Sequence, residues 1–440
     1  MADRAPVIVI GGGFTGLSCA YELAKNGVSV VVLEKESDLG GMASSFKIKG
    51  KNIEKFYHHC FCHDHSIINL AQQLGCGDQL TGTHSSVATY INGKFYRLSG
   101  PLDVLRFKPL NFRDRIRLGL LVLKASRIQD WKPLESLTAM EWLKGQCGPE
   151  VYRVVWEPLL RGKFGAHADT ISAVWIWNKL KLRGTSRNWK RQEKLLYYRG
   201  GFALLVDRLS HAICKKGGNV RTRCDVSSII CSDNRVQAVK TSDGTIEAQS
   251  VVVATALPVA ADLLSESIDS DYIASLRRIE HRANLCLVLE LSERLSSFYW
   301  LNVNDPNVPF VAVIEHTNFQ LPEDYAGKKI VYFSKYLSVS DPYYQMTGSE
   351  VLSSFLPHIK RMFPHFKDSW IENYYLWKSP YSQPVVGRDY SQIIPSVRTP
   401  INGLYLSTMA QIYPEDRGIN YAVREGMYLG QLLVKQLSNN

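Results

Sequence analysis

The 440 residues suffice for two or three structural units, one of which could be assembled from separate stretches of the chain. With 45% hydrophobic and 21% charged residues, the composition is that of a folded enzyme and excludes a disordered chain. The formal net charge of +11 at pH 7 favours anionic partners. Nine cysteines without a regular framework, and a first strand that starts too early for a secretory signal, predict a cytoplasmic protein with reduced thiols.

The beginning of the chain is predicted to form a strand, a glycine-rich turn, a helix and a second strand. The strands are the apolar runs 7–10 and 28–33, and the helix spans residues 17–26. Gly27 stands where the cap at the C-terminal end of this helix is expected. This order predicts a βαβ unit.

After this unit the character of the sequence changes twice. From residue 99 to residue 194 it is helical and basic, with prolines between the segments. Further on, apolar runs separated by turn signals predict a β-meander, a buried strand, a second sheet, and a final strand and helix. The meander comprises residues 220–230 and 235–241, and the buried strand residues 251–255. The second sheet comprises residues 283–291, 308–314 and 330–336. The final strand and helix span residues 403–406 and 421–437.

The turn after the first strand carries a nucleotide-binding pattern. Gly11, Gly13 and Gly16 occupy the three glycine positions of G-x-G-x-x-G, with Phe14 and Thr15 before the last glycine. Such a turn lets the backbone approach a pyrophosphate, and the helix that begins there directs its N-terminus at the phosphates. The pattern therefore predicts a nucleotide site.

An acidic residue and a second glycine-rich turn follow. Glu34 ends the second strand, next to Lys35, where a carboxylate can accept hydrogen bonds from ribose hydroxyls. The turn behind it, at which the backbone could approach the cofactor again, consists of Gly40, Gly41, Met42 and Ala43.

Residues 7–46, with this acid and the double glycine behind it, resemble the start of the superfamily of flavin amine oxidases, protoporphyrinogen oxidases and phytoene desaturases. The resemblance extends to Val226, where the superfamily has a valine whose backbone meets the adenine. It also covers the late strand that leads to Ala254, and residues 403–429. It says little about the middle of the chain.

Two departures from the superfamily lie near the flavin. Residues 407–409 read Ser-Thr-Met where the superfamily has Ala-Gly-Asp or a similar triplet, and Ala256 stands in place of a glycine. The acid expected at the ribityl chain is therefore either supplied by Glu415 or Asp416, or missing.

The resemblance implies an α/β fold with FAD as the cofactor. We expect a discontinuous, Rossmann-like FAD-binding domain formed by residues 1–95, 199–258 and 385–440. A helical basic insert over residues 96–198 and a mixed-sheet substrate domain over residues 259–384 complete the expected fold. In this superfamily the flavin N5 atom accepts a hydride from a C–H bond of the substrate, while the protein orients the substrate and excludes water.

By the same resemblance, the last helix directs its N-terminus at the flavin pyrimidine ring, which places Asp416, Asn420 and Tyr421 at the cofactor. Arg417 is expected either to stabilise the reduced flavin or to form a surface ion pair with Glu415 or Asp416. Tyr381 is expected to face the flavin, with core packing as its alternative.

Residues 58–65 combine histidines, cysteines and an aspartate. Their types suit zinc or copper, but the spacing matches no closed tetrahedral motif, so we predict no metal site. Because this stretch follows the double-glycine turn, we expect Tyr57, His58 and His59 on the substrate side of the flavin. His58 is the candidate acid or base near neutral pH, and an ordinary loop is the alternative.

Two basic stretches suggest partners. Residues 102–131 alternate apolar and basic side chains, as in helices that rest on an anionic membrane surface, and a solvated helix face is the alternative. Residues 179–194 are expected to bind an anionic substrate. No nucleic-acid motif frames the tryptophans there, so we expect no nucleic-acid partner.

The leading hypothesis is an FAD-dependent oxidase or desaturase acting on a hydrophobic or carboxylated small molecule held between the helical insert and the second sheet. One alternative is a non-redox flavoenzyme resembling UDP-galactopyranose mutase that acts on a nucleotide sugar. Another is a prenyl-protein carrier resembling the GDP dissociation inhibitors, which keep the fold without the cofactor.

Overall fold

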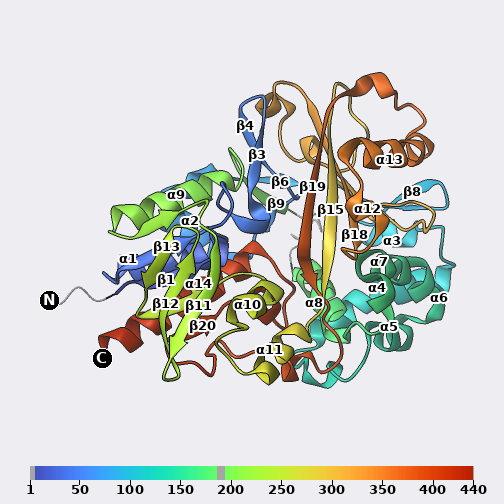
Figure 1. The fold of residues 1–440 in the computed structure, drawn as a ribbon. Coiled ribbons are helices and arrows are strands. Elements are labelled where there is room, and N and C mark those ends of the chain that lie inside the picture. The colour runs from blue at the N-terminus through green and yellow to red at the C-terminus, as the bar shows by residue number, and fades with distance from the viewer. Residues whose placement is uncertain (1–4, 186–193, 440) are drawn as a thin grey trace.

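A computed structural model describes residues 5–185 and 194–439. Figure 1 shows two halves: the half with both chain ends contains a parallel sheet, and the other contains a longer mixed sheet above a group of helices. Of the basic stretch predicted over residues 179–194, Arg187, Lys190 and Arg191 lie outside the described residues.

The first half is built on a five-stranded parallel sheet. In sheet order its strands are β10 (Asn219–Arg221), β2 (Val30–Leu33), β1 (Val7–Ile10), β14 (Ser250–Val253) and β20 (Leu404–Leu406). Side chains alternate along a strand, so Val7 and Val9 pack with the helices on one face while Ile8 and Ile10 pack on the other. Burial of both faces explains why the inner strands β1 and β2 are continuously apolar, whereas the edge strand β10 is largely exposed.

Different layers cover the two faces of this sheet. The helices on one side are α1 (Phe14–Lys25), α9 (Ala203–Lys215) and α14 (Ile419–Ser438), with α2 (His65–Gln73) against α14. The other side carries the β-meander β11 (Val226–Ser232), β12 (Arg235–Thr241) and β13 (Gly244–Glu247), with α10 (Leu257–Leu264) and α11 (Ser270–Arg277).

The single strand expected over residues 220–230 is two strands. Arg221 O accepts a hydrogen bond from Glu34 N, which ends the parallel pairing of β10 with β2. Arg223 then takes a positive φ of 55°, and the chain turns into β11 of the meander. The split therefore depends on a contact with residues far away in the sequence.

The second half is built on a seven-stranded mixed sheet. In sheet order its strands are β19 (Ile371–Pro384), β15 (His281–Leu291), β18 (Lys329–Leu337), β17 (Ala312–Glu315), β16 (Trp300–Val303), β7 (Val87–Ile91) and β8 (Lys94–Arg97). The strand expected over residues 308–314 starts only at Ala312, after Pro309, which cannot donate a ladder hydrogen bond. The hairpin β7–β8 also joins this sheet, although its first strand falls within residues 1–95, which we assigned to the FAD-binding domain.

The two faces of the mixed sheet have different roles. Helix α13 (Gly348–Met362) packs on one face, against side chains that include Leu285 and Phe333. The other face, with Cys286 and Tyr332, packs toward the first half of the molecule. Smaller elements lie around the sheets: β3 (Ser45–Ile48), β4 (Lys51–Glu54), β5 (Cys60–Phe61), β6 (Leu80–His84), β9 (Lys194–Tyr198) and α12 (Pro342–Gln345).

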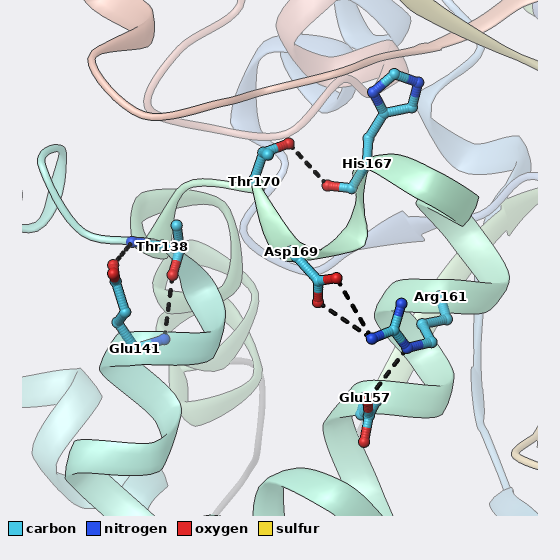
Figure 2. Close-up of polar contacts among 7 residues, drawn as sticks. All are labelled: Thr138, Glu141, Glu157, Arg161, His167, Asp169 and Thr170. Carbon is cyan, nitrogen blue, oxygen red and sulfur yellow. Dashed lines mark hydrogen bonds and ion pairs between the residues drawn. The ribbon is translucent and has the colours of Figure 1, made fainter.

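The insert between the halves is helical, as its sequence predicts. Its helices are α3 (Pro101–Leu105), α4 (Phe112–Arg127), α5 (Ala139–Cys147), α6 (Pro149–Val151), α7 (Glu157–Phe164) and α8 (Ala173–Thr185). Local polar contacts define their ends (Figure 2): the Thr138 hydroxyl accepts from Glu141 N at 3.1 Å, and Glu141 accepts from Thr138 N at 2.8 Å. Arg161 of α7 pairs with Glu157 at 3.1 Å and Asp169 at 3.2 Å.

Among the described residues, no helix has both the length and the apolar character needed to cross a membrane.

Candidate active site

The glycine turn after β1 has the shape that a pyrophosphate requires. A Cβ atom on Gly16 would lie 2.0 Å from Gly11 O, so only glycine fits where α1 meets the turn. A Cβ atom on Gly13, by contrast, would meet only Gly41 Cα, at 3.9 Å, which leaves the backbone there open to a ligand. Among the described residues no side chain caps the N-terminus of α1, so its N–H groups face this opening.

The ribose acid lies beside this turn. Glu34 is buried, and its carboxylate accepts from Gly12 N at 2.7 Å and from Glu36 N at 3.0 Å. Lys35 points outward, with 63% of its side chain exposed and Glu36 at 3.8 Å. The backbone N–H of Cys224 donates to the backbone oxygen of Glu34. Val226 follows two residues further along the chain.

The second glycine turn adjoins the first. Gly40 N donates to Gly12 O at 2.8 Å, and Gly13 and Gly40 form a parallel bridge. The turn therefore continues the same backbone surface and leads to Met42, which lines the cavity described next, while Ala43 is buried. The backbone N–H of Ala254 donates to Ile10 O at 2.8 Å, so the chain that leaves β14 borders the glycine turn.

A cavity of about 280 Å³ lies between the two halves, at the N-terminus of α14. Aromatic side chains form much of its wall, and polar groups come from the mixed sheet and from the segment before α14. The aromatic side chains are those of Tyr57, Tyr299, Trp300 and Tyr336. The polar ones are those of Asn284, Ser382, Asp416 and Arg417. Lys179 and Leu182 of α8 line it as well.

The histidine stretch contributes to the cavity wall. His58 is partly buried, and its Nδ1 atom donates to Phe56 O at 2.6 Å. Burial lowers the pKa of His58 to about 4, so its ring is neutral at physiological pH. The role of His58 as an acid or base in the reaction stays a prediction. His59 contacts the Tyr299 hydroxyl at 2.9 Å.

Three cations surround one carboxylate at the cavity. Asp416 lies 2.6 Å from Lys179 Nζ and 3.5 Å from Lys163 Nζ. Burial alone would raise the pKa of Asp416, but Lys163, Lys179 and Arg417 hold it well below its usual value. Burial lowers the pKa of Lys163 to about 8. Because Arg417 is the third cation, this part of the wall carries excess positive charge.

Arg417 is fixed in place by two hydrogen bonds. Its Nε donates to Gln383 Oε1 and its Nη2 donates to the Tyr336 hydroxyl, both at 2.9 Å. Gln383 in turn donates to Asp416 at 3.1 Å. The surface ion pair considered for Arg417 is instead made by Arg424, which lies 2.9 Å from Glu415.

Two predicted site residues are placed differently from the others. Tyr381 packs edge to face on His281 at 5.8 Å, and its neighbour Ser382 lines the cavity instead, because side chains alternate along β19. Asn420 lines the cavity, but its side-chain oxygen accepts from Ser66 N at 2.9 Å at the start of α2. Tyr421 also lies on the wall.

Sequence reasoning missed several residues of this region, among them Tyr299, Trp300, Tyr336 and Lys163. Strand alternation could have placed Tyr336 on the same face as Tyr332, but only the assembled fold brings that face to the cavity. Among the described residues, no group of three or more His, Cys, Asp or Glu side chains could hold a metal ion.

The described residues fit FAD at three places: the pyrophosphate, a ribose and the border of the flavin ring. The open backbone at Gly13 suits the pyrophosphate and Glu34 suits the ribose. The N-terminus of α14, which no side chain of the described part of the chain caps, borders the cavity. A nucleotide-binding turn that leads to an aromatic cavity is the arrangement of a flavin-binding site. The chain belongs to the family of flavin containing amine oxidoreductases, whose family model matches residues 14–427.

Curated relatives include oxidases with different substrates in their names. Flavin-containing amine oxidase A of Sus scrofa is 24% identical over 267 residues, which cover 56% of this chain and 49% of the relative. Coproporphyrinogen III oxidase of Propionibacterium freudenreichii subsp. freudenreichii is 25% identical over 182 residues, which cover 39% of this chain and 34% of that protein. The matches thus span less than half the length of these relatives.

Solved structures share the fold over almost the whole chain. An oxidoreductase from Methanosarcina mazei has a TM-score of 0.74 at 19% identity, covering 97% of this chain and 100% of that one. A reduced UDP-galactopyranose mutase has a TM-score of 0.77 at 11% identity, covering 98% of this chain and 96% of that one. At these identities the likeness establishes the α/β fold and no particular reaction.

Proposed function

We propose that this enzyme oxidises a hydrophobic or carboxylated small molecule by transfer of a hydride from a substrate C–H bond to FAD. The observation that carries this proposal is the cavity at the N-terminus of α14, which joins an aromatic wall to a cluster with excess positive charge. The aromatic side chains suit an apolar substrate body, and the cations suit a carboxylate.

FAD would be held by backbone and side-chain groups along one line. Gly13 and the N-terminus of α1 would bind the pyrophosphate, Glu34 the ribose, and Val226 the adenine. Met42 and the N-terminus of α14 would border the flavin ring. When bound, FAD supplies the hydride-accepting N5 atom.

The protein's own groups would orient the substrate and exclude water. Tyr57 donates to Ser334 Oγ at 3.3 Å, and Asn284 donates to the same oxygen at 2.9 Å, so this wall is held by its own hydrogen bonds. Lys179 reaches the cavity from α8 and would attract a carboxylate. His58, being neutral, would act as a hydrogen-bonding or base group rather than as a charged acid.

The mutase alternative remains chemically consistent with the positive charge, since a nucleotide sugar carries phosphates. A mutase needs flavin that is reduced beforehand and gives no net electron transfer. The carrier alternative does not fit a chain whose family and cofactor-binding turns indicate FAD.

The direct test is anaerobic reduction of the FAD-loaded protein by candidate substrates, followed by the flavin absorbance. We expect carboxylated or neutral apolar compounds of matching size to bleach the flavin, with a stoichiometric oxidised product. If no compound bleaches it, and a nucleotide sugar is isomerised only after the flavin has been reduced with dithionite, the mutase reading replaces this proposal.

The role of the cation cluster can be tested with Lys179→Met. Loss of a charge-assisted hydrogen bond is expected to raise KM for a carboxylated substrate roughly tenfold to a hundredfold, and to leave a neutral analogue unaffected. The matched control is Lys181→Met, since Lys181 lies over the Trp177 ring at 4.7 Å, two positions along α8. Equal effects of Lys179→Met on both substrates would contradict carboxylate binding.

A further inference from the structure

Exposed apolar side chains gather on two neighbouring helices of the insert. Twelve large hydrophobic side chains are exposed among the described residues, and six of them belong to α3 and α4, whereas the other six lie in separate segments. The six are Leu102, Leu105, Phe112, Ile116, Leu120 and Leu123, with exposed fractions of 65%, 45%, 65%, 42%, 46% and 55%. A cluster of this kind marks an interaction site, unlike scattered single residues. We call these six residues, with the cations around them, the α3–α4 face.

Helix α4 is apolar on two opposite sides. Leu118, Leu121 and Ala125 are buried against the rest of the insert. The exposed residues follow one another at spacings of four, four and three, which places them within an arc of about 80° at 3.6 residues per turn. Their arc is centred roughly opposite the buried side chains. The exposed stripe is thus a second apolar surface and not an edge of the core.

Exposed cations surround this stripe. Arg106, Lys108, Arg113 and Arg127 are exposed, and none of them forms an ion pair with a residue that the structure describes. The acidic residue of α4, Asp114, is buried and paired with Arg117 at 2.9 Å, and that of α3, Asp103, accepts from Ser99 N and Gly100 N. The α3–α4 face therefore combines apolar area with uncompensated positive charge.

The α3–α4 face is held rigidly in shape. Arg115 donates to Leu110 O at 2.8 Å and to Leu105 O at 2.9 Å, which ties α4 to the end of α3. On the opposite side, Trp177 Nε1 of α8 donates to Ala125 O at 3.0 Å. Because the backbone is fixed from both sides, the apolar side chains can enter a partner without prior rearrangement.

We propose that the α3–α4 face rests on an anionic membrane surface, with its apolar side chains among the lipid chains and its cations at acidic headgroups. Apolar area flanked by arginine and lysine is the composition of helices that lie in the membrane interface. A symmetric contact with a second copy of the chain would place the same unpaired cations against each other, which disfavours self-association. A nucleic acid bound to the same cations would leave the apolar stripe exposed to water, which disfavours it as the partner.

The test is flotation of the FAD-loaded protein with phosphatidylcholine vesicles, prepared with and without an equal amount of phosphatidylglycerol. We expect binding to the anionic vesicles that weakens as the salt concentration rises. The charge-removing variant Arg113→Gln/Arg127→Gln should weaken binding about fivefold for each arginine. The double variant Phe112→Ser/Leu120→Ser should lower it at least about tenfold, since both apolar side chains leave the interface.

Leu321→Ser is the matched control, because Leu321 is 67% exposed and lies away from the insert. It should bind vesicles as the unchanged protein does, and flavin absorbance should confirm that every variant is folded. The proposal is overturned by equal loss of binding in the control, by absence of binding to anionic vesicles, or by a dimer in light scattering that Phe112→Ser/Leu120→Ser converts to a monomer.

Discussion

At the scale of single residues, Glu34 links the cofactor turn to the second strand. Its carboxylate accepts two backbone hydrogen bonds, from Gly12 at 2.7 Å and Glu36 at 3.0 Å, so its position is set before FAD arrives. Glu34→Ala removes these bonds together with the proposed ribose contact. FAD affinity is expected to fall roughly tenfold to a hundredfold, measured by titration of the apoprotein. Glu36→Ala, at a side chain 68% exposed, is the control, and unchanged affinity in Glu34→Ala would show that the ribose lies elsewhere.

The protonation of His58 gives a second prediction. Its pKa is lowered to about 4 in the folded protein, compared with 6.5 in the unfolded chain. Between these values the unfolded state binds more protons, so His58 contributes stability above pH 6.5 that is lost as the pH falls toward 4. The His58 ring signal in NMR spectra should titrate near pH 4. A midpoint near 6.5, or identical pH dependence of stability in His58→Gln, would contradict this assignment.

Residue-level chemistry was predictable where a motif defines it. Gly11, Gly13, Gly16 and Glu34 could be selected because their spacing reflects the demands of one local turn. Tyr336 and Lys163 could not be selected, since their place at or near the cavity depends on how the mixed sheet and α7 pack against the segment before α14.

At the scale of elements, the packing of α14 on α1 positions the N-terminus that borders the cavity. A Cβ atom on Gly426 would lie 2.2 Å from Thr15 O, so a larger residue would force the two helices apart. Gly426→Val should lower the free energy of unfolding by about 1–3 kcal/mol or more and weaken FAD retention, measured by denaturant titration with and without FAD.

The control for this prediction is Gly145→Ala in α5, where nothing lies within 4 Å of the new Cβ atom. It should raise stability by about 0.5–1 kcal/mol, because alanine favours the helix. If Gly426→Val were as stable as the control variant, the close approach of α14 to α1 would be wrong.

Elements that depend on local patterns were predicted more closely than those that depend on distant contacts. The strands β1 and β12 and the helical nature of the insert follow from periodicity. The break between β10 and β11 depends on Glu34, and the addition of β7 and β8 to the mixed sheet depends on β16, so neither was visible in the sequence.

At the scale of the whole molecule, the two halves and the insert meet at one cavity. The cofactor turns and the N-terminus of α14 belong to the first half, and the wall with Asn284 and Tyr336 to the second. Helix α8 contributes Lys179 to the cavity and packs through Trp177 on α4, whose far side belongs to the α3–α4 face. Part of the net charge of +11 is thus concentrated at two places with different proposed partners.

One cavity is proposed to receive both the flavin ring and the substrate, and a crystal structure of the protein with FAD bound would show whether it does. We predict density for the pyrophosphate at Gly13 and the N-terminus of α1. The flavin ring should lie beside Met42 and the N-terminus of α14, with open space between its N5 atom and Tyr336. A flavin ring outside the cavity, or one that leaves no room for a substrate beside N5, would contradict the account.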